Sequence, residues 1–248
     1  MSSPLWPPAQ TGIALFLDVD GTLIDLAPAP DDARLRADTL ALLQRAFDAL
    51  DGALALVSGR SVNQVDQLVW PLCLPAAGVH GLERRTAQGQ HVMHADGQSL
   101  EPVRRSLRDF AGSLPGLIFE DKTLGLAIHY RHVPGAEPQV LQAVMAAAAQ
   151  LDGAATVQPG DMVIELKAGP LNKGSAVADF MREHPFSGRR PVFVGDDLTD
   201  EDALQWAAAH GGFGVAVGSR VSSTYRLQDS RAVAQWIEQL IEASKTVE

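Results

Sequence analysis

Apolar runs and helix-like spacing alternate along most of the 248 residues of this chain. Residues 13–17 (IALFL) form an apolar run without polar interruption, which is typical of a strand buried on both faces of a parallel sheet. Similar runs predict strands at 53–57, 75–80, 191–194 and 214–217. Helices are predicted between them by apolar residues at helical spacing, namely Leu35, Leu40, Leu43, Phe47 and Leu50, then Val62, Val65 and Leu68, then Val177, Phe180 and Met181, and finally Val233, Trp236, Ile237 and Leu240. This alternation is typical of an α/β fold with a parallel sheet covered by helices.

The pattern changes between residues 99 and 168. The expected order there is helix, strand, strand, helix, strand, strand, over residues 102–114, 117–120, 124–130, 140–151, 154–157 and 162–166. Tight turns are expected at 121–123 (Asp-Lys-Thr) and at Pro159-Gly160. Because this order is typical of an α+β unit, we expect 99–168 to be a second domain inserted between the two parts of the first, 1–98 and 169–248.

The composition limits the possible functions. Hydrophobic residues make up 46% and charged residues 20% of the chain, as in an ordinary globular protein. The formal net charge of -10 argues against nucleic acid or an anionic membrane as a partner. Cys73 is the single cysteine, so we expect no intrachain disulfide and a reducing compartment. Because the sequence shows neither signal-peptide character nor an apolar segment of membrane-spanning length, we expect a cytoplasmic protein.

The segment Asp18-Val19-Asp20-Gly21-Thr22 directly follows the first buried strand. Parallel sheets bind ligands at the carboxyl ends of their strands, and carboxylates at i and i+2 of an extended segment point the same way. Asp18 and Asp20 are therefore candidates to contact one phosphate group and one Mg²⁺ ion. Gly21 allows the backbone to turn close to a ligand, and Thr22 offers a hydroxyl to a phosphate oxygen. The pattern also fits an ordinary turn, but not an EF-hand, because glycine directly follows the second aspartate and a strand precedes the segment.

Two further polar segments carry candidate phosphate ligands. Ser58 and Arg60 follow the predicted strand at 53–57, where a polar strand end is the plainer explanation. Lys173 stands at the expected start of a helix. An ordinary solvated lysine would fit this position. However, a positive charge at a helix N-terminus interacts unfavourably with the helix dipole, so its presence there needs an explanation.

The segment 195–200 (GDDLTD) follows the predicted strand at 191–194. Thr199 and Asp202 have the spacing of a helix capping box, which would explain the acidic residues by helix initiation alone. Asp196 lies before such a cap and is a candidate metal ligand. For Asp200, helix capping and the role beside the metal that the family resemblance given below implies remain equally open.

These segments occur in the order of the four motifs of haloacid-dehalogenase (HAD) phosphatases, and the chain resembles that superfamily over nearly its whole length. Within it, the chain resembles the trehalose-6-phosphate phosphatases, as carried by Glu120-Asp121-Lys122, His129, Glu165, Asn172-Lys173-Gly174 and residues 195–201 (GDDLTDE). The resemblance implies a Rossmann-like HAD core with an inserted α+β cap of the C2 type. It also implies Mg²⁺-dependent hydrolysis of trehalose 6-phosphate to trehalose and inorganic phosphate, and a functional link to a trehalose-6-phosphate synthase.

Each motif residue has a chemical role under this interpretation. Asp18 attacks the phosphorus and forms an aspartyl-phosphate. Asp20 protonates the leaving sugar oxygen and then accepts a proton from water. Ser58 and Lys173 stabilise charge on the phosphoryl oxygens. The candidate phosphate-binding residues are Gly21, Thr22, Ser58 and Arg60, and the candidate Mg²⁺ ligands are Asp18, Asp20 (through its carbonyl), Asp196 and Asp200.

The inserted domain carries the candidate sugar-binding residues Glu120, Lys122, His129 and Glu165. Carboxylates paired with a lysine suit the many hydroxyls of a disaccharide, although alternating polar residues also mark the solvent side of a small sheet. The other histidines show no spacing of a transition-metal site. The alternatives are another HAD sugar phosphatase, such as one for sucrose phosphate, a hexose phosphomutase, or a catalytically silent regulatory domain. A catalytically silent domain is disfavoured because the motif aspartates and the motif lysine are all present.

Overall fold

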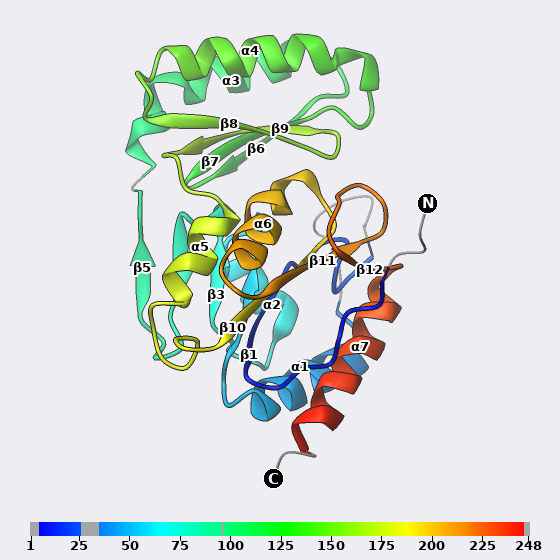
Figure 1. Cartoon of the computed structure of the whole chain (residues 1–248). Coiled ribbons are helices and arrows are strands. Elements are labelled where there is room, and N and C mark those ends of the chain that lie inside the picture. Colours follow the sequence, from blue (N-terminus) through cyan, green and yellow to red (C-terminus); the bar gives the residue numbers. More distant parts are fainter. Residues whose placement is uncertain (1–4, 26–34, 96, 246–248) are drawn as a thin grey trace. The chain divides into compact units, whose positions relative to one another are not determined.

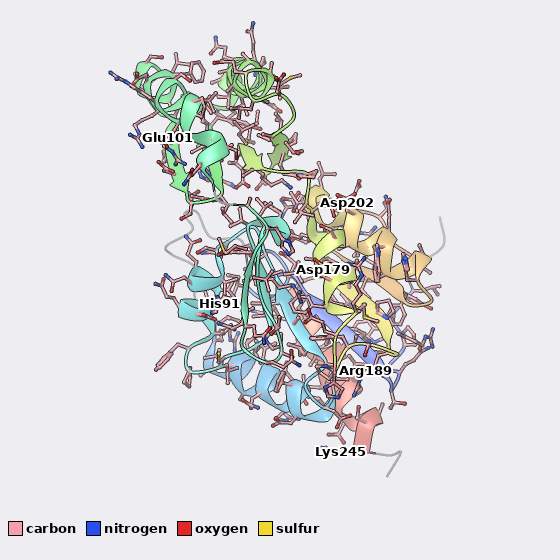
Figure 2. All side chains as sticks on the ribbon, turned by 90° about the vertical axis from the view of Figure 1, so that its left-hand side faces the viewer. His91, Glu101, Asp179, Arg189, Asp202 and Lys245 are labelled. Carbon is pink, nitrogen blue, oxygen red and sulfur yellow. The ribbon has the colours of Figure 1, made fainter. Side chains whose placement is uncertain are left out.

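The computed structural model describes residues 5–25, 35–95 and 97–245. The chain forms two compact units, the larger made of Met1–Val92 with Asn172–Glu248 and the smaller made of Met93–Leu171 (Figure 1). Figure 2 shows their side chains, with Asp179 and Asp202 on helices of the larger unit and Glu101 in the smaller one. Among the described residues, the helices are too short or too polar to cross a lipid bilayer.

The larger unit is built on a sheet whose strand order, within the described residues, is β12-β11-β10-β1-β2-β3-β4-β5. Its strands are β1 (Ile13–Leu17), β2 (Leu54–Val57), β3 (Ala76–Gly78), β4 (Glu83–Arg85), β5 (His91–Met93), β10 (Arg190–Gly195), β11 (Phe213–Val217) and β12 (Tyr225–Leu227). Pairing is parallel from β12 to β3, and β4 is antiparallel to β3. The strands predicted from apolar runs are therefore neighbours in the sheet, and their carboxyl ends share one edge.

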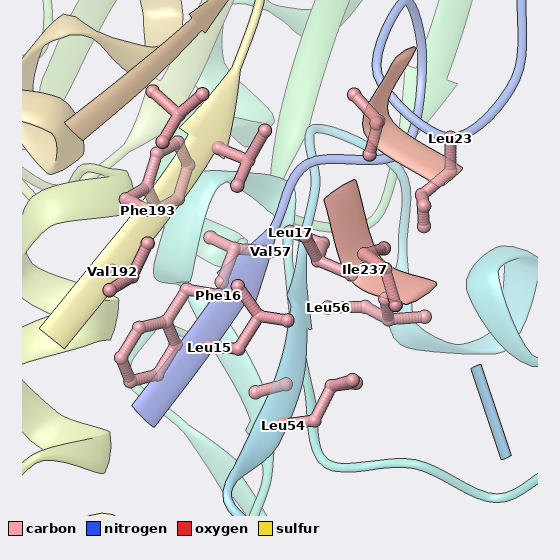
Figure 3. Close-up of a cluster of buried hydrophobic side chains, with 14 of the residues drawn as sticks. Leu15, Phe16, Leu17, Leu23, Leu54, Leu56, Val57, Val192, Phe193 and Ile237 are labelled. Carbon is pink, nitrogen blue, oxygen red and sulfur yellow. The ribbon is translucent and has the colours of Figure 1, made fainter. Parts of the chain in front are cut away.

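Helices connect and cover these strands. They are α1 (Ala37–Ala49), α2 (Val62–Val69), α5 (Lys173–Phe180), α6 (Glu201–Ala209) and α7 (Ser230–Lys245), with short 3₁₀ helices η2 (Val79–Gly81) and η5 (Leu198–Asp200). The side chains of β1 alternate between the two helical layers. Phe16 stacks with Phe186 and contacts Phe180 of α5, whereas Leu17 points to the side of Ile237 of α7 in Figure 3. All five residues of β1 are fully buried, as the apolar run predicts.

The smaller unit is an antiparallel sheet with the order β6-β7-β9-β8 and two helices on one of its faces (Figure 1). Its elements are η3 (Gln98–Leu100), α3 (Glu101–Ser113), β6 (Ile118–Lys122), β7 (Gly125–His129), η4 (Pro134–Ala136), α4 (Glu137–Ala149), β8 (Ala155–Gly160) and β9 (Val163–Ala168). Leu126, Ile128, Ile164 and Leu166 alternate along β7 and β9 and are buried. The other face of the sheet is left for polar side chains.

The compact units divide near residues 93 and 171, whereas the sequence pattern places the insertion at 99–168. At the first junction the helix η3 packs against β9 of the smaller unit.

Two turns of the smaller unit differ from the sequence prediction. β6 continues through Lys122, so its turn comprises 123–124 rather than 121–123. The Pro159-Gly160 pair lies inside β8, and the turn follows at 161–162. A proline is tolerated there because β8 is an edge strand, whose outer side makes no ladder hydrogen bonds. The prediction from turn-forming residue types thus placed both turns one or two positions too early.

Candidate active site

Asp18 stands where β1 ends, and its N–H donates to the carbonyl of Val194 in β10 at 2.9 Å. The chain then turns sharply at Gly21, which has φ 83°. A Cβ atom at Gly21 would overlap the carboxylate of Asp196. Only glycine allows this turn and this approach, so Gly21 lets the β1 loop and the β10 loop meet.

Lys173 ties two buried carboxylates together. Its Nζ donates to Asp18 Oδ1 and to Asp200 Oδ1, both at 2.6 Å. Lys173 is the first residue of α5, and the side chain of Asn172 caps that helix by accepting from the N–H of Ser175. The two carboxylates explain why a cation is placed at a helix N-terminus despite the helix dipole.

Asp196 completes a group of three carboxylates with Asp18 and Asp200. One ligand oxygen from each lies within 4.8 Å of the others, and all three residues are buried. Arg220 donates to Asp196 Oδ2 at 2.6 Å. Asp196 Oδ1 is buried without a hydrogen-bond partner among the described residues. Hard oxygen donors of this kind fit a small divalent cation such as Mg²⁺.

Electrostatics at this group show an excess of negative charge. Burial, then the charge of Asp200, raise the pKa of Asp18 well above its ordinary value, against the opposing effect of Lys173. Burial and Asp200 also raise the pKa of Asp196 to about 7. Burial alone would lower the pKa of Lys173, but the charges of Asp18 and Asp200 raise it overall. One lysine and one arginine thus face three buried carboxylates, so a further cation would stabilise their charged forms.

Asp200 caps a helical turn and also contacts Lys173. Its Oδ2 accepts from the N–H groups of Asp196 and Asp197, both at 3.0 Å, while Oδ1 accepts from Lys173. Asp197 is the N-cap of η5, and with Asp200 it forms a capping box. The capping box is thus Asp197–Asp200 rather than Thr199–Asp202, which the sequence offered as one explanation, because the helical turn begins two residues earlier. The capping bonds also hold the loop that positions Asp196.

The other candidates of the larger unit form a second group. Arg60 donates through Nε and Nη2 to the two carboxylate oxygens of Asp20, each at 2.7 Å. Ser58 Oγ accepts from the N–H of Arg60 at 3.1 Å. Thr22 is fully buried, and its hydroxyl has no partner among the described residues. Ser58, Arg60 and Asp20 are thus linked by hydrogen bonds. Thr22 is close to Asp20 in the sequence, and its side chain is buried.

The candidates of the smaller unit share the polar face of its sheet. Glu120 of β6 and Glu165 of β9 both pair with Ala127 of β7 in register. Lys122 forms an ion pair with Glu165 and lies 3.9 Å from Glu120 Oε2, and His129 Nε2 lies 2.8 Å from that same oxygen. Burial raises the pKa of Glu120, but the hydrogen bond with His129 and the charge of Lys122 outweigh it, so that its pKa is lowered overall. We call Glu120, Lys122, His129 and Glu165 the polar cluster.

Asp121 belongs to the motif by sequence but not to the polar cluster. It forms ion pairs with Arg104 and Arg108 of α3. Alternation along β6 therefore separates it from its neighbours Glu120 and Lys122.

Arg220 is the residue that the sequence analysis missed. It follows β11 in the segment Gly218-Ser219-Arg220, as Arg60 follows β2 in Ser58-Gly59-Arg60. The same rule of polar residues at the carboxyl ends of parallel strands would have singled it out.

Comparisons with known proteins agree with this geometry. The trehalose-phosphatase family model matches residues 16–234. The chain is 37% identical over 247 residues to a trehalose-6-phosphate phosphatase of Escherichia coli (strain K12), a match that covers 98% of this chain and 92% of that protein.

Solved structures are similar over almost the whole chain. The C-terminal domain of a Candida albicans trehalose-6-phosphate phosphatase has a TM-score of 0.79 at 21% identity, covering 94% of this chain and 93% of that one. A phosphatase of the haloalkanoate (HAD) superfamily from Bacteroides thetaiotaomicron has a TM-score of 0.60 at 16% identity, covering 95% and 97%. At these identities the likeness is one of fold, and it confirms the predicted HAD fold class.

Proposed function

We propose that this chain, which belongs to the trehalose-phosphatase family, hydrolyses trehalose 6-phosphate to trehalose and inorganic phosphate. The observation that carries the proposal is the buried group at the ends of β1 and β10, where Lys173 joins Asp18 to Asp200 beside Asp196. A silent relative would have no need to keep three carboxylates buried around one lysine, since burying charge is costly. The substrate would be made by a trehalose-6-phosphate synthase.

Asp18 is proposed as the nucleophile. Lys173 holds Oδ1, which leaves Oδ2 as the attacking oxygen. In the first step a bond forms between Oδ2 and phosphorus while the bond from phosphorus to the sugar oxygen breaks. In the second step a water oxygen attacks the aspartyl-phosphate, so that inorganic phosphate leaves and the Asp18 carboxylate is restored.

Asp20 is proposed to move the protons. It would protonate the leaving sugar oxygen in the first step and take a proton from the attacking water in the second. Arg60 donates hydrogen bonds to both carboxylate oxygens of Asp20 in the structure, so Asp20 must first be released from Arg60. An incoming phosphate offers two acceptor oxygens that compete for the planar guanidinium of Arg60, and we propose that substrate binding frees Asp20 in this way.

The cation is proposed to be Mg²⁺, held by carboxylate oxygens of Asp18 and Asp196 and by the carbonyl of Asp20, with Asp200 holding the Asp196 loop in place. Oδ1 of buried Asp196, which has no hydrogen-bond partner among the described residues, supports this assignment, since the hydrogen bond from Arg220 goes to Oδ2. When bound, the ion would neutralise charge on the phosphoryl oxygens. The donors are all oxygens, which favours Mg²⁺ over a histidine- or thiol-preferring metal.

Removal of the metal should abolish activity. We expect EDTA to stop phosphate release and excess Mg²⁺ to restore it. Without the cation, the carboxylates repel the negative charge of the phosphoryl group. Mg²⁺ should also raise the melting temperature of the wild-type protein and of Asp202→Ala, whose carboxylate is exposed in the first turn of α6. Asp196→Ala should lose this thermal shift. Full activity in a chelated sample, or an unchanged shift in Asp196→Ala, would refute the site.

The polar cluster is proposed to bind the sugar. Its two carboxylates, the lysine and the imidazole already satisfy one another, which keeps them fixed on one face of the sheet. Sugar hydroxyls can donate to the carboxylates and accept from the lysine, so they suit this arrangement. Binding energy from the sugar would then add to that of the phosphate group.

Loss of the polar cluster should harm only the natural substrate. We expect Glu120→Ala, Lys122→Ala and Glu165→Ala each to lower kcat/KM for trehalose 6-phosphate by at least about tenfold, the effect of losing one charge-assisted hydrogen bond. Hydrolysis of p-nitrophenyl phosphate, which has no sugar, should change little. Asp121→Ala is the matched control, because it removes a carboxylate from the same strand but from the opposite face. A parallel loss on both substrates would show that the cluster is structural.

A further inference from the structure

The backbone after β3 has positive φ at three consecutive residues, two of which are not glycine. Val79, His80 and Gly81 have φ values of 46°, 54° and 99°. The left-handed region is costly for a β-branched residue such as valine, and such strain persists only where the surrounding structure holds it. Val79 and His80 are both buried. This turn lies next to the loop that carries Ser58 and Arg60.

Three backbone hydrogen bonds join β3 and the turn after it to that loop. The N–H of Val79 donates to the carbonyl of Arg60 at 2.9 Å, and the N–H of His80 donates to the carbonyl of Ser58 at 3.0 Å. The N–H of Ser58 donates to the carbonyl of Ala77, also at 2.9 Å. Because the two bonds from the turn reach the residues on either side of residue 59, the strained turn fixes the loop on both flanks.

The imidazole of His80 fills the space beside Gly59. A Cβ atom built on Gly59 would lie 2.8 Å from Nε2 and 2.9 Å from Cε1 of His80, and its third-nearest atom is again of His80, at 3.7 Å. The φ of Gly59 is outside the left-handed region, so its backbone would accept alanine. The ring alone therefore makes glycine necessary at this position.

We propose that His80 is a positioning residue for phosphate recognition. Its strained backbone and its ring hold Ser58-Gly59-Arg60 in one conformation, which aims the Arg60 guanidinium at Asp20 and sets the N–H of Arg60 against Ser58 Oγ. A loop fixed before the substrate arrives needs no ordering when the phosphate binds, and this lowers the cost of binding. The inference rests on the proposed function only in so far as these residues contact a phosphate group.

The decisive experiment is a double-mutant cycle between Gly59 and His80. Gly59→Ala should raise KM for p-nitrophenyl phosphate and the inhibition constant of inorganic phosphate by at least about fivefold, since the new methyl displaces the ring and the loop. His80→Ala should raise both to a smaller extent. The double variant should return to the level of His80→Ala alone, because the methyl then occupies the vacated space. Double-variant values as poor as those of Gly59→Ala would overturn the proposal.

His80→Asn separates the ring from the backbone. Asparagine tolerates the left-handed region, so this variant should keep the turn and its melting temperature while losing the ring contact. We expect KM to rise by at least about threefold with kcat within about twofold of wild type, as for loss of positioning rather than of a reacting group. Asp152→Ala is the control, because Asp152 has φ 48° but lies in the smaller unit. Asp152→Ala should lower the melting temperature and leave KM and kcat unchanged.

The readouts also distinguish this inference from the proposed function. Phosphate inhibition and p-nitrophenyl phosphate hydrolysis test the loop without any sugar, so they remain informative if trehalose 6-phosphate proves not to be the substrate. Unchanged KM and unchanged phosphate inhibition in His80→Asn would overturn the positioning role even if trehalose 6-phosphate is hydrolysed.

Discussion

Asp18→Asn is expected to abolish hydrolysis of every phosphate ester while the protein still folds. The amide has the shape of the carboxylate and can still accept from Lys173, but it lacks the anionic oxygen that attacks phosphorus. Turnover should fall by at least about a thousandfold, the scale of losing a nucleophile that acts together with its partners. Phosphate release and a thermal melt, measured on the same preparation, provide the test.

Stability should not fall in this variant. Burial and the charge of Asp200 raise the pKa of Asp18, so the metal-free fold disfavours its carboxylate and should accept a neutral amide at least as well. Asp48→Asn is the control, since Asp48 is an exposed residue of α1 that bonds to Gln44. A rate near that of wild type in Asp18→Asn would exclude the aspartyl-phosphate mechanism.

Lys173→Met should impair both folding stability and chemistry. The substitution keeps the apolar stem but leaves Asp18 and Asp200 buried without their shared cation. Removing one partner from a buried ion pair costs about 3–5 kcal/mol, so we expect a loss of this size in urea unfolding with EDTA present. Turnover should fall by at least about a hundredfold, because a full positive charge near the phosphoryl group is lost. Lys245→Met, at the exposed end of α7, is the control.

The stability loss in Lys173→Met should depend on pH. Lys173 opposes the raised pKa of Asp18, so its removal should raise that pKa further above the ordinary value of 3.8. A carboxyl group whose pKa is raised by folding contributes stability below its unfolded pKa and loses that contribution as pH rises through the folded pKa. The cost of the substitution should therefore be larger at a pH above the raised pKa of Asp18 than at a pH below its ordinary value of 3.8. Equal costs at both pH values would show that Lys173 serves packing alone.

The convergence of Asp18, Ser58 and Asp196 could be predicted from the sequence. Each follows an apolar run, and the three strands β10, β1 and β2 are neighbours, so their carboxyl ends lie at one edge. Parallel pairing follows from runs that are buried on both faces. Local pattern and tertiary arrangement agree here, which is why simple rules sufficed.

Other contacts depend on tertiary detail that local pattern does not carry. The double hydrogen bond of Arg60 to Asp20 joins two loops that are far apart in the sequence, and nothing in the residue types of the turn at 79–80 signals a left-handed valine. The strands β4, β5 and β12 have three residues each, too short for a period-2 pattern to show. The Pro159-Gly160 pair misled the prediction because an edge strand tolerates the residues that normally mark a turn.

A comparison of rates on four phosphate esters tests the identity of the substrate most directly. Phosphate release is measured with Mg²⁺ for trehalose 6-phosphate, sucrose 6-phosphate, glucose 6-phosphate and p-nitrophenyl phosphate, and the glucose phosphate sample is also assayed for conversion to its 1-phosphate isomer. We expect kcat/KM for trehalose 6-phosphate to exceed that for each other substrate by at least about a hundredfold, since discrimination by buried hydrogen bonds to hydroxyls reaches this size or more. Isomer formation without phosphate release would identify a mutase. Absence of phosphate release from all four substrates would identify a silent domain. A kcat/KM for sucrose 6-phosphate equal to or higher than that for trehalose 6-phosphate would contradict trehalose 6-phosphate as the substrate.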